Sequence, residues 1–180
     1  LLIFFNTSFQ VGKKIILPAT FSGSPRAMQQ NYQDAMAIVR HYGKPDLFIT
    51  MTCNPKWPEI TACLKTWETP EERPDIVARV FNLKLKEMIA DLEKNHIFGR
   101  VNGLVHVVEF QKRGLPHAHI LLILHPSDKP HPDTYDQYVC AEIPDKDTCP
   151  TLFECVKSHM VHGPCGDDGS ECPCMKDPKC

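Results

Sequence analysis

Two apolar segments in the middle of the chain, residues 101–110 and 117–124, have the length and the valine, isoleucine and leucine content of β-strands. The connection between them is short and contains Gly114 and Pro116, residues that favour a turn. The pattern therefore predicts a β-hairpin, and any fold of this chain must place the two segments side by side in an antiparallel sheet.

Helical periodicity precedes this hairpin. After Ser24, a residue type that caps helices, apolar side chains recur at three- and four-residue spacing over residues 25–42. A longer amphipathic stripe covers residues 75–94, and the apolar segments 46–52 and 13–17 are typical of strands. We therefore predict an α+β fold with a largely antiparallel central sheet and helices packed on one face.

Composition narrows the class of protein without identifying a partner. The chain has 180 residues, of which 42% are hydrophobic and 23% charged, as in soluble globular proteins. The formal net charge of -2 gives no overall basic field for nucleic acid, although a local patch remains compatible with it. The apolar residues 1–5 are too few for a signal peptide, and no apolar run reaches the roughly 18 residues of a membrane span. We expect an intracellular protein without a membrane partner.

The second hairpin strand contains His117 and His119 on either side of Ala118. Residues two apart on a strand project from one face, roughly 6.6 Å apart, so both imidazoles can approach one cation while Ala118 points into the core. Glu109 on the first strand can add a carboxylate, and Gln111 shares its face. Two imidazoles and a carboxylate suit a catalytic divalent cation, although two half-exposed histidines without a metal would show the same spacing.

Cysteines gather at the C-terminal end. Seven of the nine lie between Cys140 and Cys180, together with His159 and His162, and an odd number does not suit an even disulfide framework. Residues 162–180 show no apolar periodicity, so a bound Zn²⁺ would supply stabilisation that the composition lacks. The alternative is a set of free thiols on a poorly ordered end.

Polar, basic and aromatic residues follow the strand at 46–52 and occupy the hairpin turn. Hydroxyl, amide and cationic groups contact phosphates or base edges, and an indole stacks on an unpaired base. Trp57 suits the core equally well, and the turn residues suit an ordinary polar hairpin tip. The candidate DNA-binding residues are Thr52, Asn54, Lys56, Trp57, Lys112 and Arg113.

Two of these stretches carry a family resemblance. The segment EFQKRGLPHAHILL resembles motif 2 of the Helitron Rep domain, the signature of HUH endonucleases, and FITMTCNPKW resembles motif 1. The similarity to the Helitron helicase-like N-terminal region extends from about Val11 to Cys180, whereas residues 1–10 diverge. It implies a Rep/HUH-like core over residues 11–125. Composition adds a proline-rich linker with a short helix over 126–158 and a small Cys/His-rich zinc module over 159–180. The zinc ligands that the resemblance implies are Cys165, Cys174 and Cys180, and the fourth ligand would be either His162 or Cys172.

The resemblance implies metal-assisted transesterification on single-stranded DNA at transposon ends. His117, His119 and Glu109 would hold Mg²⁺ or Mn²⁺ against the scissile phosphate while a tyrosine attacks it. The parent protein would also carry a downstream ATP-dependent helicase domain and work in the nucleus, as a rolling-circle transposase does.

The sequence departs from the family at the nucleophile. The family's tyrosine motif follows the Cys-rich segment, and no P-loop occurs here. We therefore expect no catalytic tyrosine and no helicase activity within these 180 residues. The four tyrosines present, none of which we assign to catalysis, are Tyr32, Tyr42, Tyr135 and Tyr138.

Three functions remain open at this point. The first is the nicking and strand-transfer domain of a Helitron transposase. The second is a metal-stabilised module that binds single-stranded DNA without chemistry, from a decayed or domesticated copy. The third is an unrelated metallohydrolase that activates water, which would need no tyrosine.

Overall fold

The computed structural model describes residues 15–112 and 114–160, which belong to two units, Leu1–Lys129 and Pro130–Cys180. The first unit contains the sheet and its helices. The candidate residues Arg113, His162, Cys165, Cys174 and Cys180 lie outside the described residues.

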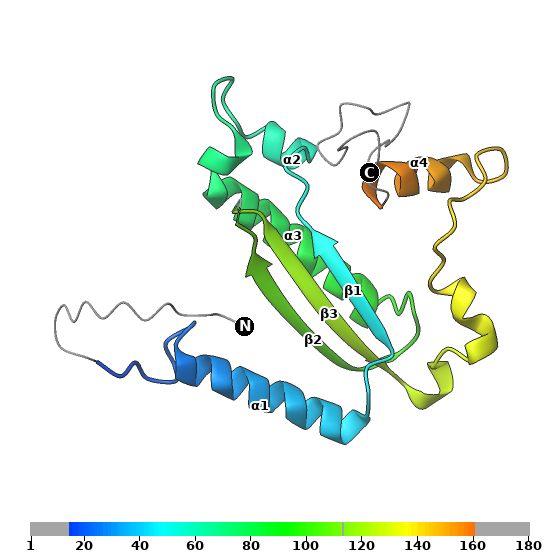
Figure 1. Ribbon diagram of the computed structural model, residues 1–180, viewed down its shortest axis with the longest axis horizontal. Helices are drawn as coiled ribbons and strands as arrows, with labels where there is room; N and C mark the ends of the chain where they lie inside the picture. The colour runs from blue at the N-terminus through cyan, green and yellow to red at the C-terminus, as the bar shows by residue number, and fades with distance from the viewer. Residues whose placement is uncertain (1–14, 113, 161–180) are drawn as a thin grey trace, which may run out of the picture. The chain divides into compact units, whose positions relative to one another are not determined.

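A three-stranded antiparallel sheet forms the centre of the first unit (Figure 1). Its strands are β1 (Leu47–Thr52), β2 (Val101–Phe110) and β3 (Pro116–Leu124), in the spatial order β1-β3-β2. The strands predicted at 46–52, 101–110 and 117–124 are thus confirmed, and β2 and β3 form the predicted hairpin. Because β3 has a neighbour on each side, it is the strand most firmly held in the sheet.

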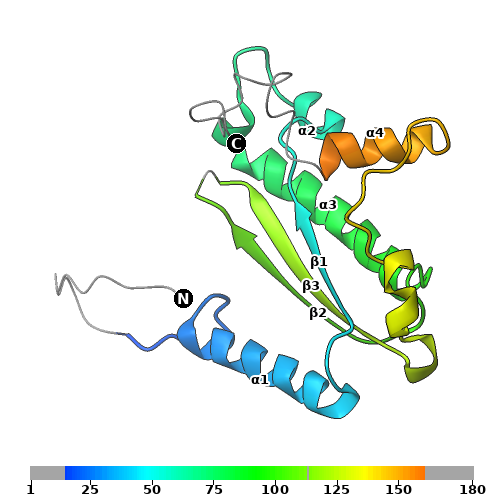
Figure 2. The ribbon, with the colours of Figure 1, turned by 45° about the vertical axis from the view of Figure 1, so that its right-hand side comes forward.

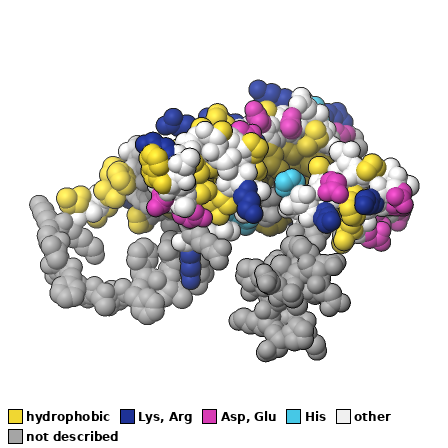
Figure 3. All heavy atoms as spheres, turned by 90° about the horizontal axis from the view of Figure 1, so that it is seen from above, with side chains coloured by type: hydrophobic (Ala, Val, Ile, Leu, Met, Phe, Trp, Pro, Cys, Tyr) yellow, Lys and Arg dark blue, Asp and Glu magenta, His cyan; other side chains and the backbone are white. Residues whose placement is uncertain are grey.

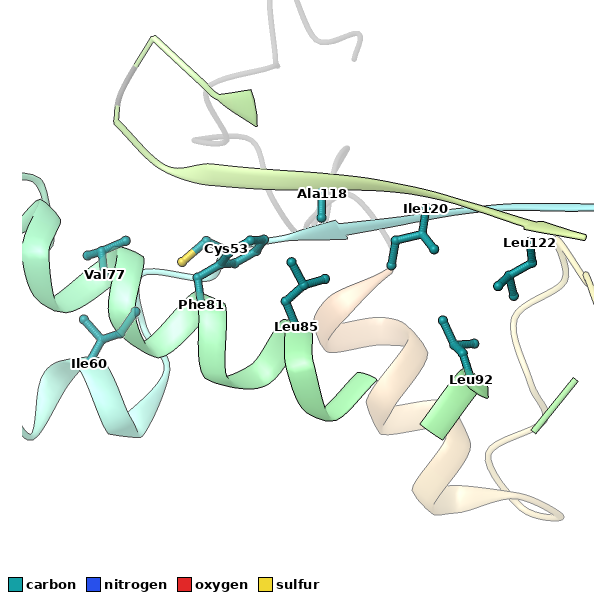
Figure 4. Packing of buried hydrophobic residues seen from close by; sticks show 9 residues of the cluster. All are labelled: Cys53, Ile60, Val77, Phe81, Leu85, Leu92, Ala118, Ile120 and Leu122. Carbon is teal, nitrogen blue, oxygen red and sulfur yellow. The ribbon is translucent and has the colours of Figure 1, made fainter. Parts of the chain in front are cut away.

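One face of the sheet is covered by α3 (Pro74–Glu93). Phe81 and Leu85, both nearly inaccessible to solvent, point toward the Ala118 and Ile120 side chains of β3 (Figure 4). The short helix α2 (Pro58–Thr61) adds Ile60 to the same core. The alternation of β3 therefore commits its even-numbered residues to the hydrophobic core.

The other face of the sheet receives α1 (Pro25–Tyr42) at one end (Figure 2). Ser24 caps this helix, its Oγ accepting a hydrogen bond from the Ala27 backbone N–H at 3.1 Å. A Cβ at Gly103 would lie 2.9 Å from Ile38 of α1 and 3.4 Å from Ile123, so α1 packs on the odd-numbered side of β3. The expectation that the helices cover one face therefore holds for α2 and α3 but not for α1.

The strand predicted at residues 13–17 is wrong where the structure describes it. Residues 15–17 have no regular secondary structure, and Ile15 and Ile16 are 75% and 79% exposed. A strand needs a hydrogen-bonded neighbour, and an apolar run alone does not supply one.

The start of β2 is fixed by a turn that includes η2 (Pro126–Asp128). The Asp128 carboxylate accepts hydrogen bonds from the Arg100 backbone N–H and guanidinium, each at 2.8 Å, and these bonds hold the pKa of Asp128 well below its usual range. Gly99 has a φ of 110°, and a Cβ there would lie 2.8 Å from the Asp128 Cβ. This junction anchors the strand that carries Glu109 at its far end.

In the first unit, the 3₁₀ turn η1 (Pro70–Glu72) lies between α2 and α3. The second unit contains the 3₁₀ helix η3 (Pro132–Gln137) and the helix α4 (Pro150–His159). Cys140, Cys149 and Cys155 are exposed and unpaired. None of the helices in the described ranges has the length and hydrophobicity that crossing a bilayer requires.

Burial separates Cys53, directly after β1, from the exposed cysteines. Its side chain is 2% exposed, and desolvation raises its pKa from 9.0 to about 11. Alkylation requires the thiolate, so at pH 8 we expect Cys53 to react at least about 100-fold more slowly than Cys63, which is exposed in the same unit. Mass spectrometry of peptides after timed iodoacetamide treatment measures both rates, and equal rates in the folded chain would contradict the burial of Cys53.

Candidate functional site

His117 and His119 lie on the central strand, on the face opposite α3. Ala118 and Ile120 are completely buried against that helix, and strand alternation turns the histidines the other way. Both imidazoles are half-buried. The predicted division of the strand, with Ala118 in the core and both histidines on one face, is thus confirmed.

Three side chains from neighbouring strands meet on this face. The His117 and His119 ring centroids are 4.5 Å apart, with the ring planes at 73°. Glu109 of β2 pairs directly with His117, and its Oε2 lies 3.8 Å from His119 Nε2. The hairpin register therefore brings the Glu109 carboxylate next to the His119 imidazole, whose ring in turn lies beside that of His117.

The third strand adds a hydroxyl group. Thr52 of β1 pairs with His117, and its Oγ1 lies 2.7 Å from His117 Nδ1. His119 has no equivalent contact, because its Nδ1 is buried and makes no hydrogen bond within the described residues. Instead, Phe48 of β1 stacks on the His119 ring at a centroid distance of 5.4 Å and an angle of 6°. Different contacts therefore hold the two rings.

The chemistry of this donor set fits a divalent cation. Two ligand atoms each about 2.1 Å from one ion are at most about 4.2 Å apart, and the 3.8 Å between Glu109 Oε2 and His119 Nε2 is within that limit. Across the part of the chain that the structure describes, no three His, Cys, Asp or Glu side chains are already disposed around one metal position. The described structure therefore brings the donors together without closing a coordination sphere.

The candidate DNA residues are at the end of the sheet where these side chains meet. Asn54 and Lys56 follow β1, which ends beside the start of β3, and Lys112 is on the β2–β3 turn. Lys56 and Lys112 are exposed, whereas the Asn54 Oδ1 accepts a hydrogen bond from the Lys56 backbone N–H at 2.9 Å. The antiparallel topology thus puts both stretches at the same end of the sheet, near the histidines.

Trp57 behaves as a packing residue. It is half-buried against the core cluster, and Lys84 Nζ lies 5.1 Å from the centroid of its ring. Lys84 also forms a 2.7 Å ion pair with Glu59. Base stacking by Trp57 stays a prediction that these contacts do not require.

Charge is mixed rather than uniformly basic. On the face drawn in Figure 3, Lys and Arg side chains alternate with Asp and Glu side chains. Because the whole chain has a net charge of -2, binding of DNA would have to rely on individual cations near the site, such as Lys56 and Lys112.

The sequence-based assignment of site residues omitted Phe48. Its side chain is 62% exposed and on the histidine face. The alternation of side chains along a strand could have identified Phe48, since residues 48, 50 and 52 of one strand must share a face. Gly103 carried a separate signal, for the position of α1. A glycine inside a strand often marks the close approach of another element, and here that element is α1.

The comparison with protein-family models agrees with the resemblance. The model of the Helitron helicase-like domain at the N-terminus matches residues 6–122, which include β1, α3 and the β2–β3 hairpin up to Leu122. The match begins inside residues 1–10, the segment that we expected to diverge. No curated protein matches the chain. Because the family match covers well over half of the sequence and includes both histidines and Glu109, the chain belongs to the Helitron helicase-like N-terminal domain family.

Proposed function

We propose that this chain is the Rep-type HUH domain of a Helitron transposase, which nicks single-stranded DNA and transfers the cut strand. The observation that carries the proposal is the meeting of His117, His119 and Glu109 on one open face of the sheet. These are the residues of motif 2 and its preceding strand, within the segment that matches the family.

The chain's own contribution is to hold a cation and a phosphate together. When bound, Mg²⁺ or Mn²⁺ would polarise the scissile phosphoryl group and stabilise the charge that develops on its oxygens. His117 and His119 supply neutral nitrogen donors, and Glu109 supplies a carboxylate oxygen. Their position on paired strands, rather than on a loop, keeps the donors in a fixed register.

The strand transfer is a transesterification with balanced bonds. A tyrosine Oη loses its proton and forms a bond to phosphorus, the bond from phosphorus to the 3′ oxygen breaks, and that oxygen takes up a proton. The product is a 5′-phosphotyrosine with a free 3′-hydroxyl on the other fragment. By the family resemblance, this tyrosine would follow Cys180, in a parent chain that also carries the helicase domain.

Single-stranded DNA would lie along the histidine face. Phe48 offers an exposed aromatic ring for a base, and Lys56 and Lys112 offer cations for phosphates at the adjacent sheet end. The part of this face covered by α1 is at the opposite end, near Gly103 and Ile123, so α1 leaves the histidines open.

Iron-directed cleavage tests whether the cation and the DNA share this site. Fe²⁺ suits two histidines and a carboxylate, and with ascorbate and peroxide it produces radicals that cut only nearby backbone. The purified chain, loaded with Fe²⁺, is expected to cut an end-labelled single-stranded oligonucleotide at a limited set of positions. Rising salt should weaken the cutting, because phosphate contacts release counterions.

Matched variants decide the outcome. Glu109→Gln is expected to lose the localised cutting, whereas Glu93→Gln, at the end of α3, should retain it. Equal cutting by both variants would overturn the proposed site. Retained DNA binding without iron-dependent cutting would favour the alternative, a single-stranded DNA-binding module without metal chemistry. A Zn²⁺ site made by His162, Cys165, Cys174 and Cys180 stays a separate proposal from the sequence.

A further inference from the structure

The hydroxyl of Thr52 is engaged with a histidine ring. Its Oγ1 lies 2.7 Å from His117 Nδ1, across a directly paired position of β1 and β3. Sequence alone assigned Thr52 to DNA, but this contact uses the hydroxyl inside the protein. Residues 52 and 117 are 65 positions apart in the chain, so the bond exists only when β1 and β3 pair in this register.

The bond restricts which nitrogen of His117 can meet a cation. A ring nitrogen that is hydrogen-bonded to Thr52 cannot also bind a metal, so Nδ1 is occupied and Nε2 is left for the cation. A cation requires a lone pair on Nε2, and a neutral imidazole with a lone pair on Nε2 carries its proton on Nδ1. The Nδ1–H group must then donate to Thr52 Oγ1.

We propose that Thr52 is a positioning residue that fixes the Nδ1-protonated tautomer of His117 and so presents Nε2 to the divalent cation. This inference rests on the proposed function, because it assumes that His117 is a metal ligand. Metal-binding histidines commonly donate their second ring N–H to a neighbouring acceptor, and loss of such an acceptor lowers affinity or activity roughly 10- to 100-fold.

The neighbouring residue Thr50 provides a matched control. It is on the same strand and the same face, is exposed like Thr52, and pairs with His119. Its hydroxyl makes no hydrogen bond to His119, whose Nδ1 is without a partner in the described structure. The two threonines therefore differ in the contact that the proposal concerns and in little else.

Calorimetric titration of the 180-residue chain with Mn²⁺ gives the first measurement. Thr52→Val, which keeps the side-chain shape but removes the hydroxyl, is expected to bind Mn²⁺ roughly 10- to 100-fold more weakly than wild type. Thr52→Ser should recover most of the affinity, and Thr50→Val should stay near the wild-type value. Equal affinity of Thr52→Val and wild type would overturn the role of Thr52.

Nitrogen-15 NMR of the imidazoles in the metal-free chain gives the second measurement. Wild type is expected to show His117 with a protonated Nδ1, and Thr52→Val should show a mixture of tautomers, with the His119 signals unchanged. A protonated Nε2 on wild-type His117 would overturn the inference. If wild type bound no Mn²⁺, the proposed metal site would fail, and the NMR result would still decide whether Thr52 sets the tautomer.

Discussion

Replacing His119 with alanine is expected to weaken Mn²⁺ binding by more than about 100-fold, beyond the range seen for residues that only support a ligand. The His119 Nε2 lies 3.8 Å from Glu109 Oε2, close enough for both atoms to bind one ion. Removing the imidazole leaves Glu109, a 65% exposed carboxylate, and His117 as the two remaining donors of the proposed set. Titration calorimetry of the purified chain measures the change directly.

His106 offers the matched control for that substitution. It is on β2, pairs with Ile120 and is exposed, which places it on the α3 side of the sheet rather than the histidine face. His106→Ala should bind Mn²⁺ like wild type, because strand alternation keeps its ring away from Glu109. Equal losses in His106→Ala and His119→Ala would show that Mn²⁺ binds to surface histidines in general, contrary to the proposed site.

Much of the site can be predicted from local sequence, because it depends on the alternation of side chains along a strand and on the β2–β3 turn. The hairpin turn fixes which residues of β2 and β3 are opposite one another, and alternation decides which face each occupies. Those two rules bring Glu109 to the histidines and Ala118 to the core. The long apolar stripe of α3 likewise predicts a helix that buries one side.

The remaining features depend on contacts between segments far apart in the sequence. An amphipathic helix shows which of its sides is buried, but not which face of a sheet it covers, so the position of α1 near Gly103 was not predicted. The bond between Thr52 and His117 depends on the register of β1 against β3, which no local turn sets. Trp57 satisfies both a stacking and a packing pattern, and its contacts with the core and with Lys84 come from segments that local sequence does not relate.

The core under the histidine strand gives the second large expected effect. Phe81→Ala should destabilise the first unit by about 3–5 kcal/mol, since the phenyl ring is 2% exposed and its removal leaves a cavity among buried neighbours. Domains of this kind are stable by about 5–15 kcal/mol, so the loss is a large share of the total. Ala118 and Ile120 pack in the same cluster, and loosening them should also loosen the strand that carries His117 and His119.

Urea unfolding followed by tryptophan fluorescence measures the stability of the first unit, because both tryptophans, Trp57 and Trp67, belong to that unit. Leu83→Ala is the matched control on the same helix, where the side chain is 57% exposed and truncation should change stability by no more than about 0.5 kcal/mol. The midpoint of Phe81→Ala should fall sharply at an unchanged denaturant slope. Similar midpoints for the two variants would mean that α3 does not pack against the sheet through Phe81, and the support inferred for the histidine strand would fail with it.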